Sequence, residues 1–68
     1  MSRLKAIALA SDILGSKAEL ARAIQVDPAT VTKWFKGKRE PTPQQASEIE
    51  RMTGGQIKRE WIRPAIFG

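Results

Sequence analysis

SKAELARAIQVDPATVTKWFK, residues 16–36, contains two helix starts that only a short turn separates. Ser16 is followed three residues later by Glu19, the spacing of a capping box, so a helix should begin directly after Ser16. Asp27 can cap a second helix, with Pro28 at its first position, where the missing N–H costs nothing. A short helix, a tight turn and a second short helix that ends in basic residues predict a helix-turn-helix.

The apolar residues of this helix-turn-helix, about residues 17–36, indicate which face is buried. Ala21 is small where the two helices should cross, and Val31 and Trp34 fall on the inward face of the second helix. Phe35 adjoins Trp34, so both cannot point fully inward; Phe35 either packs under a following helix or lies partly exposed. The same periodicity turns one strip of the second helix outward, formed by Pro28, Ala29, Thr32, Lys33 and Lys36.

Helix signals on both sides of this unit predict an all-α domain of about five short helices. An apolar helical period over residues 4–14 ends at Gly15, and "TPQQ" at residues 42–45 forms a second capping box, with Pro43 at the first helical position. That helix should stop at "TGG", residues 53–55. The tail, residues 56–68, fits either a single helical turn before a proline or an extended segment. Its "WIRPAIFG" either covers the first helix or forms a self-association surface.

Composition restricts the chemistry of this chain. Its 68 residues predict one domain spanning 1–68, and the absence of cysteine and histidine argues against disulfides, thiolate chemistry and the usual zinc sites. No cofactor or metal is expected, and the glutamates at 48, 50 and 60 are interpreted as surface charges, so we expect no enzyme activity. No run is apolar enough to span a bilayer, and "LKAIALASDIL" contains Asp12, so we expect a cytoplasmic protein.

The positive charge of the chain gathers at the end of the second helix of the helix-turn-helix. The net charge is +5, and Lys33, Lys36, Lys38 and Arg39 lie close together. Cations at a helix C-terminus can be solvated charges that complement the helix dipole. The capped helical pair that precedes them favours nucleic acid instead, because lysine and arginine gain free energy by releasing counterions from phosphates.

GSKAELARAIQVDPATVTKWFKGKREPTPQQASEIERMTGG, residues 15–55, resembles the Cro family of phage repressors and the related small Cro/CI-type regulators of prophages. "IERMTGG" followed by "IRPAIFG" is similar to the C-terminal signature of the YdaS-like antitoxin group. The resemblance implies a lambda-repressor-like DNA-binding domain and a transcriptional repressor that binds double-stranded operator DNA, as a homodimer at least on DNA. One position departs from the pattern: Gln25 stands in the turn where the family usually has glycine for a positive φ.

The resemblance also implies roles for individual residues. The outward strip would contact bases in the major groove: Lys33 could donate to guanine, and Ala29 or the Thr32 methyl could pack on a thymine methyl. The phosphate backbone would be held by Ser16, Lys17, Lys38 and Arg39. From a different functional class, the alternative is an antitoxin-like protein-interaction module that neutralises a partner protein.

Overall fold

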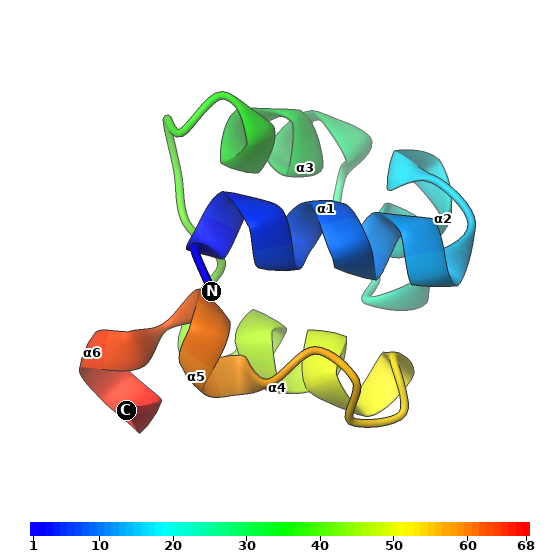
Figure 1. Cartoon of the computed structure of the whole chain (residues 1–68). Helices are drawn as coiled ribbons and strands as arrows, with labels where there is room; N and C mark the ends of the chain where they lie inside the picture. The colour runs from blue at the N-terminus through cyan, green and yellow to red at the C-terminus, as the bar shows by residue number, and fades with distance from the viewer.

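Six helices and no strands make up the computed structural model, which describes all 68 residues. The helices are α1 (Arg3–Leu14), α2 (Lys17–Ala23), α3 (Pro28–Phe35), α4 (Pro43–Met52), α5 (Arg59–Ile62) and α6 (Pro64–Phe67). In Figure 1, α1 runs between α3 on one side and α4 with α5 on the other. The predicted all-α class and the helix-turn-helix α2–α3 are therefore confirmed.

The tail supplies two helices where one turn or an extended segment was expected. Steric conflict with a proline ring disfavours helical backbone at the residue before it, and Arg63 accordingly has φ −129° and ψ 68° between α5 and α6. α5 is the single helical turn expected before Pro64, α6 adds one helix to the expected number of about five, and the extended alternative is wrong. Ile62 is fully buried and α5 contacts α1, so the first part of "WIRPAIFG" covers the first helix, whereas Ile66 of α6 stays exposed.

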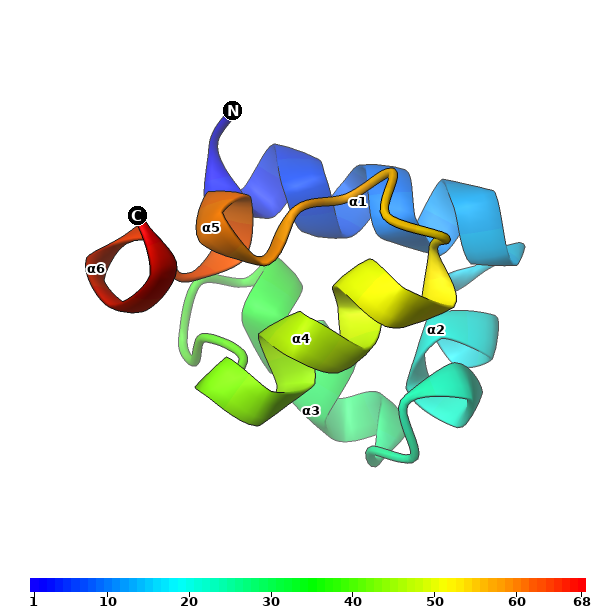
Figure 2. The same ribbon diagram turned by 90° about the horizontal axis from the view of Figure 1, so that it is seen from below.

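One apolar core joins the helix-turn-helix to the rest of the chain. Ile7 of α1, Leu20 of α2 and Ile49 of α4 are all fully buried in it. Seen from below, α4 passes in front of α3, and α1 runs along the upper edge of the view (Figure 2). Val31 and Trp34 point into this core from α3, as predicted, which fixes the opposite face of α3 toward solvent.

The turn of the helix-turn-helix is a Schellman motif with glutamine at its left-handed position. The Val26 N–H donates to the Ala21 carbonyl at 2.9 Å, and the Gln25 N–H donates to the Arg22 carbonyl at 3.3 Å. Gln25 has φ 57°, whereas the equivalent positions after α3 and α4 hold glycine. The positive φ expected at Gln25 is therefore confirmed.

The predicted capping boxes have different outcomes. At α4, Thr42 and Gln45 form both reciprocal hydrogen bonds, at 2.9 and 3.1 Å. At α2, the Glu19 N–H donates to Ser16 Oγ at 3.1 Å, but the Glu19 carboxylate pairs with Arg22. The predicted hydrogen bond from the Ser16 backbone N–H to the Glu19 carboxylate is therefore wrong. The Arg22 guanidinium, one turn along the helix, offers this carboxylate a charged donor instead. The predicted start of α2 is nevertheless correct.

A cluster of ion pairs ties both chain ends to the loop between α3 and α4. Glu40 pairs with Arg3 at 2.8 Å and with Arg63 at 3.0 Å. Arg3 Nε also donates to the Ile62 carbonyl at 2.8 Å, and Arg63 Nη1 donates to the Pro41 carbonyl at 3.0 Å. This Glu40 clamp anchors the segment that carries the cations following α3.

Candidate nucleic-acid interface

The outward strip predicted for α3 is solvent-exposed at every position. Its five residues, Pro28, Ala29, Thr32, Lys33 and Lys36, are all exposed, while Val31 and Trp34 on the opposite face are 0% and 1% exposed. Asp27 caps the helix, since its Oδ1 accepts a hydrogen bond from the Ala29 N–H at 2.8 Å. The helix ends at Phe35, with Lys36 as its C-cap, one residue earlier than expected. The strip is thus presented on a helix whose orientation the core determines.

Thr32 is restricted in what it can offer to a ligand. Its hydroxyl donates to the Pro28 carbonyl one turn earlier, at 3.2 Å. Because the hydroxyl proton is used in this way, the Thr32 methyl group is the part best suited to a new contact. Together with Ala29, the strip can therefore offer two small apolar groups beside the ammonium groups of Lys33 and Lys36, the combination that suits thymine methyls beside guanine acceptors.

The residues expected at phosphates lie at two places around α3. Ser16 caps α2, and Lys17, the first residue of α2, has its Nζ 4.2 Å from the centroid of the Phe35 ring. Phe35, the last residue of α3, is half-buried, so it neither enters the core fully nor stands free in solvent. The contact brings the N-terminus of α2 to the C-terminal end of α3.

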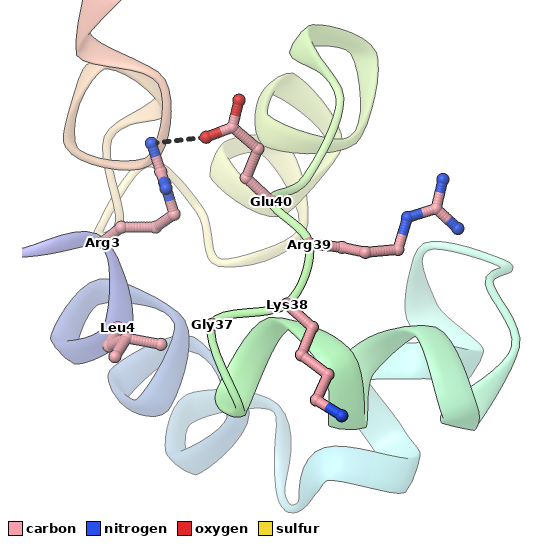
Figure 3. A pocket seen from close by; sticks show the side chains of 6 residues that line it. All are labelled: Arg3, Leu4, Gly37, Lys38, Arg39 and Glu40. Atoms are coloured by element: carbon pink, nitrogen blue, oxygen red, sulfur yellow. Dashed lines mark ion pairs between the residues drawn. The ribbon is translucent and has the colours of Figure 1, made fainter.

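Lys38 and Arg39 follow α3 in a backbone segment held by hydrogen bonds. Their N–H groups both donate to the Lys33 carbonyl, at 3.0 and 3.4 Å, within a Schellman motif. A pocket of about 350 Å³ adjoins this segment and is lined by Arg3, Leu4, Gly37, Lys38, Arg39 and Glu40. In Figure 3, Glu40 turns toward Arg3, while the side chains of Lys38 and Arg39 extend away from that pair.

Ion pairing divides the cations of the chain into two groups. Five of the six arginines pair with glutamates, and Arg39 is the exception. No lysine forms an ion pair. Five of the seven unpaired cations belong to the helix-turn-helix and the segment after it: Lys17, Lys33, Lys36, Lys38 and Arg39. With Asp27 as the one carboxylate of this region outside an ion pair, the surface keeps a net positive charge, which suits a polyanion.

Two contacts at this site could not be predicted from the local sequence. The ring of Phe35 beneath Lys17 depends on how α2 crosses α3, and the Glu40 clamp joins residues far apart in the chain. The structure contains no cluster of histidine, cysteine or carboxylate residues that could hold a metal ion. None of its helices has the length and apolar character required to cross a membrane.

Known proteins resemble this chain over most of its length. The family model described as "Bacterial toxin YdaS" matches residues 7–68. The "Putative transcriptional regulator YdaS" of Escherichia coli (strain K12) is 35% identical over 54 residues, which are 79% of this chain and 55% of that protein. The chain thus spans about half the length of this curated relative, and no solved structure matches it. The chain belongs to the YdaS family, which confirms the YdaS-like part of the resemblance, although the family description names a toxin where an antitoxin group was expected.

Proposed function

We propose that this protein is a transcriptional regulator that binds double-stranded DNA sequence-specifically by placing α3 in the major groove. The observation that carries the proposal is the group of five unpaired cations around an exposed helix, on a chain whose other arginines are all paired. The name of the Escherichia coli relative, "Putative transcriptional regulator YdaS", supports the same class of function.

The proposed interface separates base reading from backbone binding. Pro28, Ala29, Thr32, Lys33 and Lys36 face the base edges. Ser16, Lys17, Lys38 and Arg39 contact phosphates on either side of α3. Phosphate contacts set the register of the helix in the groove, and base contacts supply the preference for one sequence.

Selection of binding sites from a random duplex pool, followed by affinity measurement on the selected duplex, tests the proposal. Lys33→Ala should reduce the preference for the selected sequence, since one good base contact is worth about 1–3 kcal/mol of discrimination. Lys58→Ala is the matched control, because Lys58 is also exposed and unpaired but lies just before α5. Equal losses for the two variants, or no selected sequence at all, would contradict the proposal.

The phosphate contacts predict a steep dependence of affinity on salt. Each neutralised phosphate contributes about 0.9 to the slope of log K against log salt concentration. Lys38→Ala should therefore lower that slope by about 1 and weaken all sequences alike. Titrations of the selected and a scrambled duplex at several salt concentrations measure both effects. A wild-type affinity insensitive to salt would exclude this role for Lys38.

The finer proposal is a Cro-type phage or prophage repressor that acts in the bacterial cytoplasm as a homodimer on operator DNA. It rests on the resemblance of residues 15–55 to Cro. A two-fold symmetric protein requires half-sites separated by about one helical turn of DNA, so the selected sequence should be a palindrome. A single asymmetric half-site, bound by one protomer, would refute the dimer.

A second candidate function is action on a protein partner, as an antitoxin-like module or a toxin. The family description, which names a bacterial toxin, is the observation that favours it. Expression of the wild type and of Lys33→Ala in a bacterial host separates the candidates. Growth inhibition or partner binding that persists when Lys33→Ala has lost specific DNA binding would support the second function; loss of both together would support DNA regulation.

A further inference from the structure

Lys17 and Phe35 form a contact between the two helices of the helix-turn-helix. Lys17 is the first residue of α2 and Phe35 the last residue of α3, and the ammonium nitrogen lies 4.2 Å from the ring centroid. A cation at this distance over an aromatic face is attracted by the negative face of the ring. The contact is thus a cation–π interaction at the edge of the proposed DNA-binding surface.

The Phe35 ring is the only group in the structure that interacts with the charge of Lys17. Lys17 is exposed and forms no ion pair, because the nearby Glu19 carboxylate pairs with Arg22. The ring is the stiffer member of the contact, since Phe35 is half-buried and packs against the core cluster. A free lysine side chain samples many rotamers, and a fixed ring beneath its ammonium group restricts them.

We infer that Phe35 is a positioning residue that holds the Lys17 ammonium group ready for a DNA phosphate; this inference rests on the proposed DNA-binding function. The ring face attracts the cation without accepting its hydrogen bonds in the way that a carboxylate would. The three N–H donors of Lys17 therefore stay available to phosphate oxygens. Because part of the ordering of Lys17 precedes binding, less conformational entropy is lost in the complex.

A double-mutant cycle on the selected duplex tests this role. Lys17→Met removes the charge and keeps the aliphatic chain, and Phe35→Leu removes the ring and keeps an apolar side chain. Phe35→Leu should weaken DNA binding about two- to fivefold in the wild-type background. In the Lys17→Met background it should have no further effect, and Phe35→Tyr, which retains an aromatic ring, should bind as the wild type does.

A chemically synthesised chain with pentafluorophenylalanine at position 35 extends the test to a case in which packing is preserved. Fluorination keeps the shape of the ring but reverses its quadrupole, so the same two- to fivefold loss is expected without unfolding. Thermal melts of every variant establish that each is folded. If Phe35→Leu proves to be unfolded, the fluorinated chain alone decides the test.

The outcomes separate this inference from the proposed function. Equal losses for Phe35→Leu with and without Lys17, or wild-type affinity in the fluorinated chain, would overturn the role of Phe35 while specific DNA binding by the wild type still stood. Unchanged binding by Lys17→Met would overturn it as well. A wild-type chain that binds no duplex specifically would overturn both proposals.

Discussion

Gln25 occupies the position in the turn of the helix-turn-helix where the backbone conformation most favours glycine. Its φ of 57° lies in the left-handed region, where a Cβ approaches the following carbonyl oxygen. The two Schellman hydrogen bonds of the turn require this conformation. Gln25 is exposed, so its side chain gains little burial to offset the strain. The turn that sets the angle between α2 and α3 is therefore strained at one residue.

Gln25→Gly should raise the free energy of unfolding by about 1 kcal/mol, because glycine adopts a positive φ without that steric conflict. Urea denaturation measures the change. Gly54→Gln is the matched control: Gly54 has φ 64°, takes the same position after α4 and has open space around a built Cβ. It should lose a similar amount. A Gln25→Gly variant no more stable than the wild type would show that the turn carries no strain.

The first four helices each begin with a polar side-chain cap, but the capping boxes predicted at α2 and α4 are completed differently. The reciprocal box of Thr42 and Gln45 satisfies two backbone donors at the start of α4. At α2 only the Ser16 bond forms, and Glu19 pairs with Arg22 on the exposed surface of the helix. Equivalent patterns in the sequence therefore stabilise their helices by different amounts.

Gln45→Ala should cost about 1 kcal/mol of stability, since it removes a hydrogen bond to the Thr42 N–H at the N-terminus of α4. Glu19→Ala removes only an exposed ion pair and should cost a few tenths of a kcal/mol. Denaturant titrations of the two variants, recorded side by side, test this order. A larger loss for Glu19→Ala would indicate that its carboxylate does complete the α2 capping box.

At the scale of the whole molecule, arginine–glutamate pairs join the C-terminal helices to the rest of the chain. The Glu40 clamp holds Arg3 and Arg63, and Glu50 of α4 pairs with Arg59 of α5. The hydrogen bond from Arg59 lowers the pKa of Glu50, against the opposing effect of burial. Together with the pair of Arg51 and Glu48, these pairs engage four arginines away from the proposed DNA-binding surface.

The Glu50 pair should make stability depend on pH. A carboxyl whose pKa is lower in the folded state stabilises the fold above its unfolded pKa, and this stability is lost as the pH falls through the folded pKa. Glu50→Gln should therefore be less stable than the wild type at pH 7, by about 0.5–1 kcal/mol because Arg59 is partly exposed, and the difference should vanish in acid. Glu60→Gln is the control, since Glu60 forms no ion pair. Thermal melts from pH 7 to pH 3 measure both; an equal deficit at every pH would contradict the prediction.

Local sequence patterns are enough to predict the starts of α2, α3 and α4, the turn between α2 and α3, and the outward strip of α3. Caps such as Asp27 and Thr42 act on backbone donors within one turn, and helical periodicity sorts Val31 and Trp34 from Thr32 and Lys33. These are short-range interactions, so neighbouring residue types are enough to reveal them. The base-contacting and phosphate-contacting roles remain predictions.

Contacts between side chains of different helices could not be predicted from the sequence. Arg3 reaches the Ile62 carbonyl across 59 residues of sequence, and Arg63 reaches that of Pro41 across 22. Lys17 meets Phe35 because the core fixes the crossing of α2 and α3, and the tail became two helices because it could bury Ile62 against α1. No local pattern encodes such contacts, because their partners are brought together only when the shared apolar core forms.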